Sequence, residues 1–436
     1  MNLKEALRLL FRRVIALYFR QIEVVGEVPV RDTHGRIFGA NHMNGIVDPV
    51  LVMTQVPCII SPVAKSTLWD IPGLRWLLDA AAAVPIVRRR DSPGKDASKN
   101  DEVFDRIASH LSTGGNVLIF PEGTSHNEPH LLDLKTGAGR MLARAKGTAN
   151  AKGLTFQAVG LEFEARTIFR SRALVLFGPV RDVDAIGKSG DELAVAVTER
   201  LKADLSALLV EGPTWEDRVF IAHVAEMFAN HAGDRSLATW NEVGRRVGEA
   251  RAALLPGDAL HQQIRDEVSA YYKELDAAGL SDDQLSQGGG FTLQPSRVLR
   301  ALVLISALPL AAFGVLLYWL PYQLPRLVVR FSRSTDDVVS TYKLGTGLLV
   351  MPLSAAIYAV AAFIFLPALH AALFTVASIA GAFAALAWSD RSPRLYGSLR
   401  VLVSTARVAE LRTKRVAIMK LLAVARERFE PAAPAA

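Results

Sequence analysis

The stretch that decides the fold is Arg36-Ile37-Phe38-Gly39-Ala40, which leads directly into Asn41-His42-Met43-Asn44-Gly45-Ile46-Val47-Asp48-Pro49. The first five residues predict a strand, and polar residues at the carboxyl end of a strand mark the usual position of a site in an α/β sheet. A histidine with a nearby carboxylate can take a proton from a hydroxyl group, because the carboxylate fixes the imidazole tautomer and stabilises the imidazolium. Five residues separate His42 from Asp48, which does not align them on one face of a helix, so we expect a turn at Gly45 to close the pair.

Further candidate strands follow, with helix-periodic segments between them. We expect strands at 82–87, 116–120, 155–163 and 173–177, and helices at 96–112 and 135–146. Strands that alternate with helices favour an α/β layer structure, which we expect over residues 21–210.

The composition narrows the class of partner. The chain has 436 residues, 50% of them hydrophobic, and a formal net charge of +7. This charge suits phospholipid headgroups, the phosphates of coenzyme A or nucleic acid. Nucleic acid is disfavoured because the long apolar segments would have to be hidden. Cys58 is the only cysteine, which excludes an intramolecular disulfide and fits a cytosolic catalytic face; we expect it to be a small buried apolar residue.

Residues 1–20 have the pattern of an amphipathic helix. Leu3, Leu7, Leu10, Val14 and Leu17 recur at helical spacing, with charges largely on the other faces. These charges also interrupt any apolar core of the length that a signal peptide needs. Two interpretations stay open: a helix that lies on anionic lipid, or a helix packed on the domain.

Residues 211–297 predict a helical region that ends in a linker. The last helix of the catalytic region is expected at 190–210. The helical region itself should contain helices at 214–230, 237–254 and 258–278, followed by the linker Ser286-Gln287-Gly288-Gly289-Gly290. We find no catalytic constellation here. His223, His231 and His261 are scattered, so we expect packed or solvated histidines and no metal site.

Residues 298–389 predict membrane segments, because neither 301–325 nor 344–389 contains a charged residue and a span needs about 20 apolar residues. The first run is one helix or a re-entrant hairpin bent at Pro309. The second predicts two helices with a break near Pro367. The basic tail, 390–436, is expected in the cytoplasm by the positive-inside rule. We therefore expect an integral membrane protein with its catalytic domain on the cytoplasmic face.

The run Asn41–Asp48 resembles the first motif of the glycerophospholipid acyltransferases, which include the glycerol-3-phosphate and lysophosphatidate acyltransferases. The resemblance implies a mixed sheet flanked by helices, His42 as general base, Asp48 as its partner, and Asn41 and Asn44 in support. The usual spacing has four intervening residues, and the five found here are similar to the fungal-type glycerol-3-phosphate/dihydroxyacetone-phosphate branch.

The run Phe120-Pro121-Glu122-Gly123-Thr124-Ser125 resembles the third motif of that family, which binds the phosphate region of the acyl acceptor. The resemblance places Glu122, Gly123 and Thr124 at the acceptor. A carboxylate does not attract phosphate, so we expect Glu122 to fix basic side chains or the acceptor hydroxyl, while Gly123 lets backbone approach the ligand. Lys135, in the following Leu134–Gly139 run, either meets the phosphate or starts a helix.

Three arginines are the further candidates for phosphate binding. Val84–Arg88 resembles the second motif, whose arginine binds the acceptor phosphate, and Arg88 matches by position; the alternative is a basic surface turn. Arg170 and Arg172 are phosphate candidates or residues flanking a strand. The fourth motif normally carries a proline near Val159, which is absent here. The resemblance covers about 35–180 and extends faintly to the run Asp337–Lys343.

These motifs together predict a membrane-bound enzyme that moves a fatty acyl group from acyl-CoA or acyl carrier protein to the hydroxyl of glycerol-3-phosphate, with membrane lipid as partner and no cofactor beyond the thioester. Lysophosphatidate is the alternative acceptor. A hydrolase with Ser125 or Ser66 as nucleophile is disfavoured because no Gly-x-Ser-x-Gly elbow surrounds either residue. A non-enzymatic membrane scaffold is the alternative of another class. The acyl chain length and the oligomeric state stay open.

Overall fold

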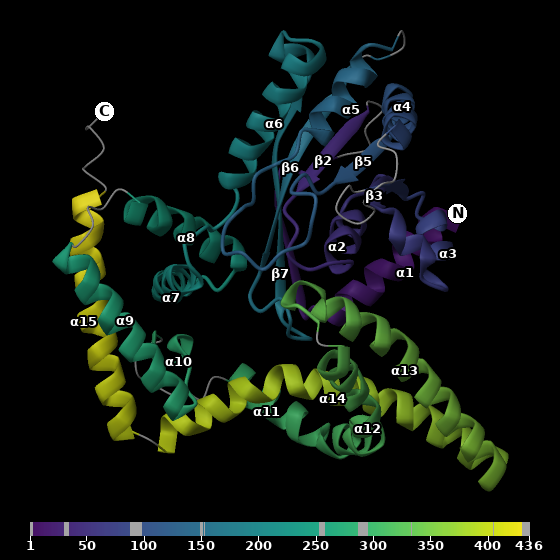
Figure 1. The fold of residues 1–436 in the computed structure, drawn as a ribbon. Coiled ribbons are helices and arrows are strands. Elements are labelled where there is room, and N and C mark those ends of the chain that lie inside the picture. The colour runs from purple at the N-terminus through teal and green to yellow at the C-terminus, as the bar shows by residue number, and fades with distance from the viewer. Residues whose placement is uncertain are drawn as a thin grey trace. The chain divides into compact units, whose positions relative to one another are not determined.

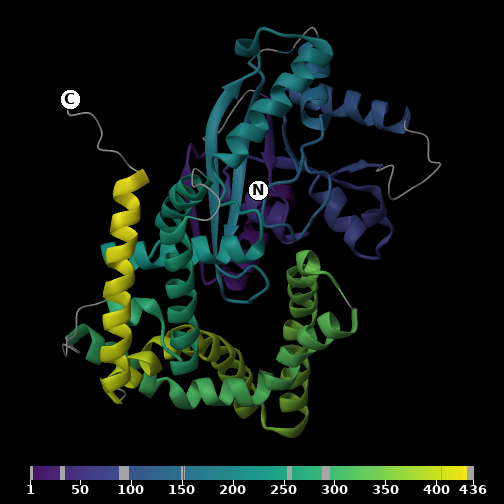
Figure 2. The same ribbon diagram turned by 60° about the vertical axis from the view of Figure 1, so that its left-hand side comes forward.

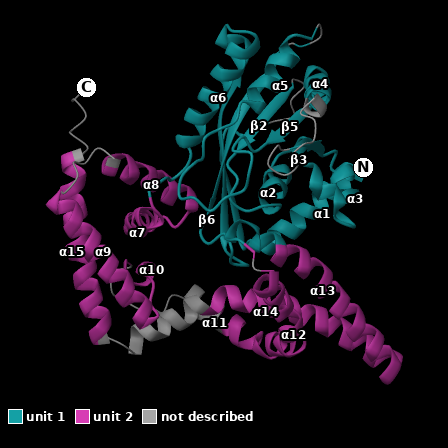
Figure 3. Ribbon diagram, viewed as in Figure 1, with its two compact units in different colours: residues 1–213, 335–341 teal, residues 214–334, 342–436 magenta. Residues whose placement is uncertain are grey.

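The predicted strands belong to one mixed sheet in a computed structural model of the chain, which describes residues 3–29, 35–87, 98–148, 151, 153–252, 258–286, 295–332, 334–403 and 405–429. The chain divides into two compact units. Unit 1 comprises Met1–Pro213 together with Thr335–Thr341, and unit 2 comprises Thr214–Ser334 and Tyr342–Ala436 (Figure 3). The units are described separately below.

The described part of unit 1 contains a seven-stranded sheet in the order β1-β7-β6-β2-β5-β3-β4 (Figure 1). The strands are β1 (Gln21–Gly26), β2 (Arg36–Ala40), β3 (Ile60–Lys65), β4 (Val84–Ile86), β5 (Asn116–Ile119), β6 (Thr155–Phe163) and β7 (Arg172–Asp182). Neighbouring strands are parallel except for the antiparallel pair β6–β7. The mixed sheet implied by the family resemblance is therefore confirmed.

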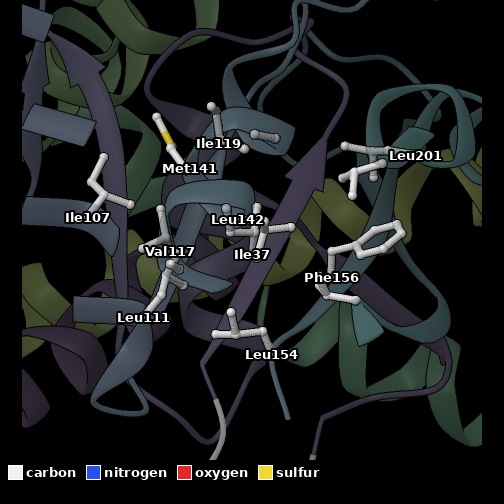
Figure 4. Packing of buried hydrophobic residues seen from close by; sticks show 14 of the residues in the cluster. Ile37, Ile107, Leu111, Val117, Ile119, Met141, Leu142, Leu154, Phe156 and Leu201 are labelled. Carbon is white, nitrogen blue, oxygen red and sulfur yellow. The ribbon is translucent and has the colours of Figure 1, made fainter. Parts of the chain in front are cut away.

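Helices flank the sheet in unit 1. They are α1 (Leu3–Tyr18), α2 (Val47–Gln55), α3 (Leu74–Ala80), α4 (Ser98–Ser112), α5 (Gly137–Lys146) and α6 (Gly190–Ser206). One buried cluster joins Ile37 of β2, Val117 of β5 and Phe156 of β6 to the apolar faces of α4, α5 and α6 (Figure 4). The long strands β6 and β7 run beside α6 (Figure 2). Successive strand residues face opposite sides, so Phe38, next to Ile37, meets Phe177 instead.

The predicted strands at 36–40 and 155–163 are confirmed, and those at 82–87 and 116–120 are confirmed with shorter bounds. The fifth strand is longer than predicted, because its antiparallel pairing with β6 continues to Asp182. Two strands escaped prediction. β1 is an edge strand with polar residues in alternation and little burial, and β3 contains Pro62, which usually argues against a strand inside a sheet.

Unit 2 is helical throughout its described residues. Its elements are α7 (Trp215–Ala232), α8 (Leu237–Ala252), α9 (Ala259–Ala278), α10 (Asp282–Ser286), α11 (Pro295–Ser306), α12 (Leu308–Ser332), α13 (Asp336–Phe365, whose first residues belong to unit 1), α14 (Ala368–Val403) and α15 (Thr405–Phe429). The helices predicted between 214 and 278 are confirmed. The predicted linker at 287–290 lies outside the described residues. The described part of the basic tail is helical, and Arg415 of α15 forms a buried ion pair with Asp282 of α10.

Two described helices, Asp336–Phe365 and Ala368–Ser392, are long and apolar enough to cross a membrane, judged by length and composition. The chain leaves α13 at Phe365 and resumes as α14 at Ala368, so the break predicted near Pro367 is confirmed. The first apolar run is not one helix, because it divides at Ala307 between α11 and α12. The break precedes Pro309, which sits in the first turn of α12, where a proline removes no helical hydrogen bond.

Candidate active site

His42 and Asp48 meet at the carboxyl end of β2. The Nδ1 atom of His42 lies 2.9 Å from Oδ2 of Asp48. Gly45 adopts φ +48°, so the predicted turn is confirmed. The chain then enters α2, whose first turn carries Asp48. The sequence did not predict this helix, which is what brings the carboxylate back over the histidine despite the five intervening residues.

The surroundings of Asp48 assign the protons of the pair. Its Oδ2 also accepts the backbone N–H groups of Met43 at 2.9 Å and Asn44 at 2.7 Å, and the residue is fully buried. Both backbone amides donate to the same carboxylate oxygen that faces the imidazole, so this oxygen acts as an acceptor. We therefore assign the His42 proton to Nδ1, which leaves Nε2 as a hydrogen-bond acceptor. The His42 ring stacks on Phe120 with centroids 4.0 Å apart, and its side chain keeps 13% exposure.

Asn41 and Asn44 connect the His42 loop to the backbone of the neighbouring segment that contains β6 and the loop after it. Asn41 donates Nδ2–H to the carbonyl of Leu161 at 3.0 Å and accepts the Leu161 N–H at 2.7 Å. This pair of bonds continues the β2–β6 ladder past Ala40. Asn44 donates Nδ2–H to the carbonyl of Arg166 at 3.3 Å. Both asparagines are buried, so the supporting positions implied for them agree with their contacts.

Glu122, at the end of β5, orders the backbone of the same loop. Its Oε1 accepts the His42 N–H at 2.8 Å, and its Oε2 accepts the Leu132 N–H at 2.9 Å and meets Nε2 of His126 at 2.5 Å. The carboxylate is buried, with 3% of the residue exposed. Glu122 thus fixes one basic side chain, the His126 imidazole, as expected. It also fixes two backbone amides that the sequence did not predict.

Gly123, Thr124 and Lys135 lie on the outer side of this turn. Gly123 has φ +77°, and a Cβ atom there would lie 2.7 Å from Nζ of Lys135, so the lysine chain crosses directly over the glycine. Thr124 donates its hydroxyl to the Ser125 carbonyl at 3.1 Å. Lys135 lies two residues before α5, and its side chain reaches the Gly123 turn. Within the described residues its exposed ammonium makes no hydrogen bond or ion pair.

Two of the three arginines predicted as phosphate ligands lie within the described residues. Arg88 lies outside the described residues. Arg170 donates Nη1–H to the carbonyl of Leu17 at 2.8 Å, at the C-terminal end of α1. Arg172 begins β7, is 8% exposed and pairs with Glu164 through Nε at 3.1 Å. Their guanidinium groups hold the end of α1 and the start of β7, contacts that fit the alternative, residues flanking a strand. Their role as phosphate ligands stays a prediction.

Two residues that the sequence did not single out lie beside His42. Arg166 donates Nη1–H to the carbonyls of Met43 at 3.2 Å and His126 at 3.5 Å. His126 donates its backbone N–H to the carbonyl of His42 at 3.2 Å. The order of the strands in the sheet could have identified both residues. β6, β2 and β5 are adjacent and both pairings are parallel, so the loops that follow these strands lie at the same edge of the sheet.

The comparison with protein families agrees with this geometry. Residues 21–159 match the family model described as Acyltransferase, a range that includes β2, the His42–Asp48 pair and Glu122. Unit 1 therefore contains a region that is similar to the acyltransferase family.

Individual relatives cover part of the chain. Glycerol-3-phosphate O-acyltransferase 2 of Saccharomyces cerevisiae is 26% identical over 224 residues, which cover 50% of this chain and 30% of that protein. Lyso-ornithine lipid O-acyltransferase of Pseudomonas aeruginosa is 31% identical over 136 residues, covering 31% of this chain and 46% of that protein. The matches thus span less than half of either relative.

Among solved structures, the 1-acyl-sn-glycerophosphate acyltransferase PlsC of Thermotoga maritima aligns with a TM-score of 0.34 at 17% identity. The alignment covers 46% of this chain and 78% of that chain.

Proposed function

We propose that the chain transfers a fatty acyl group from acyl-CoA or acyl carrier protein to a hydroxyl of glycerol-3-phosphate, as a membrane-bound enzyme of phospholipid synthesis. The observation that carries the proposal is the 2.9 Å contact between His42 Nδ1 and Asp48 Oδ2 inside a region that is similar to the acyltransferase family. The pair leaves Nε2 of a partly exposed imidazole ready to accept a proton, which is what activation of an acceptor hydroxyl requires.

In the proposed reaction, Nε2 of His42 takes the hydroxyl proton while the acceptor oxygen bonds to the thioester carbonyl carbon. The carbon–sulfur bond then breaks, and the thiolate leaves and receives the proton from the imidazolium. Asp48 stabilises the imidazolium during this transfer. A thiolate is a competent leaving group, so no acyl-enzyme is needed. General-base help of this kind contributes a factor of about 10²–10⁴.

The acceptor phosphate needs a cation near the base. Lys135 supports this role, because its exposed ammonium lies over Gly123 in the turn that also carries Glu122. Arg88 remains a candidate from the sequence. A fixed phosphate would place the acceptor hydroxyl at His42, and such positioning lowers the entropic part of the barrier. The similarity to the yeast glycerol-3-phosphate O-acyltransferase 2 supports this acceptor.

The test is an acyl-transfer assay on the purified full chain in detergent, with labelled acyl-CoA or acyl carrier protein and glycerol-3-phosphate. The wild-type chain should form labelled acyl-glycerophosphate, and His42→Ala should form none while retaining its fold by circular dichroism. His231→Ala, which changes an exposed histidine of α7, serves as the matched control. Near-normal turnover by His42→Ala would contradict the mechanism, and retained cellular function of that variant would favour a scaffold.

A lyso-lipid is the second candidate acceptor, favoured by the similarity to lyso-ornithine lipid O-acyltransferase. The same assay with lysophosphatidate in place of glycerol-3-phosphate separates the two. A higher kcat/KM for lysophosphatidate would replace the first acceptor by the second without changing the role of His42.

The cytoplasmic orientation of the domain is part of the proposal and rests on the basic residues of the tail.

A further inference from the structure

A short segment far along the chain belongs to the catalytic unit. Thr335–Thr341, which we call the strap, groups with unit 1 although the chain on both sides of it belongs to unit 2. The strap includes the first residues of α13, which begins at Asp336. It stands about 290 residues after the His42 motif, so its presence in unit 1 is a product of tertiary folding alone.

The strap bonds to each of the three loops that build the site. Ser125, in the loop after β5, donates its hydroxyl to Oδ2 of Asp337 at 2.5 Å. Ile46, in the loop after β2, donates its N–H to Oγ1 of Thr341 at 3.0 Å. Ser340 donates its hydroxyl to the carbonyl of Arg166, in the loop after β6, at 2.6 Å.

These contacts are closely packed. Asp337 and Val339 are each 8% exposed, and Ser340 is fully buried. A Cβ atom on Gly45 would lie 2.6 Å from Oγ1 of Thr341 and 3.1 Å from the carbonyl oxygen of Asp337. The glycine therefore serves twice: it allows the positive φ that closes the His42–Asp48 pair, and it lets the strap approach that turn.

The bond from Ile46 has a specific consequence for Asp48. Ile46 is the N-cap residue of α2 and has no side chain that accepts a hydrogen bond. The start of a helix leaves backbone N–H groups without helical partners, and an outside acceptor stabilises it. Thr341 supplies such an acceptor at the helix end that carries Asp48, two residues further on.

We propose, on the basis of the function proposed above, that the strap is a positioning element of the active site, with Asp337 and Thr341 as its positioning residues. Thr341 holds the start of α2 and with it Asp48, while Asp337 holds Ser125, three residues after Glu122. His42 depends on both loops, through its side chain on Asp48 and its backbone on Glu122. The strap thereby keeps Nε2 of His42 at the place where the acceptor hydroxyl must arrive.

The position of the strap in the chain extends the proposal. Only Tyr342 and Lys343 separate it from the uncharged stretch that begins at Leu344, within a helix apolar enough to span a membrane. Two hydrogen bonds in succession connect the start of that helix to the catalytic base, so a displacement of the helix start would change the position of His42. This makes the order of the site dependent on a segment that adjoins the bilayer.

The test uses the full chain in lipid nanodiscs with the variants Asp337→Ala and Thr341→Val. We expect kcat to fall about 10–100-fold, the range seen when the partner that orients a functional residue is lost, with KM for both substrates changing less than about threefold. Asp337→Asn and Thr341→Ser keep an acceptor for the same donors and should restore most of the activity. Asp191→Ala, which removes an exposed carboxylate in the first turn of α6, is the matched control.

Hydrogen–deuterium exchange gives a readout that does not need activity. Peptides covering 42–48 and 122–127 should exchange faster in Asp337→Ala and Thr341→Val, while a peptide covering 172–182 of β7 should not change. If the wild-type chain transfers no acyl group, the proposed function fails and the exchange data still decide on the strap. Unchanged kcat and exchange in both variants would overturn the proposal. An equal effect of Asp191→Ala, or a uniform rise in exchange across unit 1, would also overturn it.

Discussion

His42 donates its backbone N–H to Oε1 of Glu122 at 2.8 Å, across 80 residues of chain. The two residues follow β2 and β5, which are parallel neighbours in the sheet, so their loops leave the same edge side by side. The family resemblance places Glu122 at the acceptor. Its contacts instead connect it to the backbone of the base, which changes what its substitution should do.

Glu122→Gln should lower kcat about 10²-fold and leave KM for the acceptor nearly unchanged, because misplacing the base by about 1 Å has an effect of that size. The buried Glu122 carboxylate accepts from His42, Leu132 and His126, and an amide would direct its own N–H groups at one of these donors. We also expect a loss of about 1–3 kcal/mol in the free energy of unfolding. Steady-state kinetics and thermal unfolding measure both effects.

Glu128→Gln is the matched control, since Glu128 is exposed in the same loop. A large rise in acceptor KM for Glu122→Gln at unchanged kcat would show instead that the carboxylate contacts the substrate.

Lys135→Ala should raise KM for glycerol-3-phosphate about tenfold and change kcat little. Its exposed side chain lies over Gly123, in the turn that also carries Glu122, where we expect it to meet the acceptor phosphate. The assay should use acyl carrier protein as well as acyl-CoA as donor. A rise in KM confined to acyl-CoA would assign the lysine to the phosphates of coenzyme A instead. Lys188→Ala, at an exposed lysine before α6, is the control.

Arg172→Ala should affect stability rather than substrate binding. The guanidinium of Arg172 is nearly buried against Glu164 at the start of β7. Its removal takes one of two guanidinium partners from Glu164, which keeps Arg20 at 2.8 Å. We therefore expect the free energy of unfolding to fall by about 1 kcal/mol. Acceptor KM should stay within about twofold of the wild-type value. A tenfold rise in that KM with unchanged stability would restore Arg172 as a phosphate ligand.

The outer face of α1 should lie in lipid. Leu3, Leu10 and Leu17 recur every seven residues and are 59%, 57% and 40% exposed, while Ile15 and Tyr18 are buried in unit 1. We expect a fluorophore on Leu10→Cys, in a Cys58→Ala background, to be quenched by doxyl-labelled lipid in nanodiscs. Arg12→Cys, about 200° around the helix, is the control and should be quenched less. Equal, weak quenching at both positions would leave α1 as a helix packed on the domain only.

Acid should weaken the helical unit through His223. Burial lowers the pKa of His223 from 6.5 to about 4, and its ring stacks on Tyr272 with centroids 3.6 Å apart. Between these two values the unfolded chain binds a proton that the folded chain excludes. The stability from neutral His223 is therefore complete above pH 6.5 and is lost as pH falls towards 4, by up to roughly 3 kcal/mol.

His223→Phe keeps an aromatic ring against Tyr272 and removes the titration. Thermal unfolding at pH 7 and pH 4.5 should show a smaller acid-induced drop in Tm for the variant than for the wild-type chain. Parallel drops in both proteins would exclude His223 as the source of the acid sensitivity.

The sequence alone determined what depends on neighbouring residues. Alternating apolar runs and helical periodicity predicted the α/β class, most strands and the helices between 214 and 278, because neighbouring residues are enough to define these elements. The absence of charge predicted the two helices that divide near Pro367. The His42–Asp48 pair was also predictable, since a turn at Gly45 closes it within seven residues.

The tertiary structure decided everything that depends on which strands are neighbours. The order β6-β2-β5 brings Arg166, His42 and Glu122 to one edge of the sheet, and no local pattern contains that order. For the same reason the partners of Arg170 and Arg172 could not be read from the chain, because one guanidinium holds the end of α1 and the other pairs with a carboxylate eight residues earlier. The strap is the extreme case. Its side chains reach the His42 loop across some 290 residues, and only the folded chain shows that the turn at Gly45 has room for them.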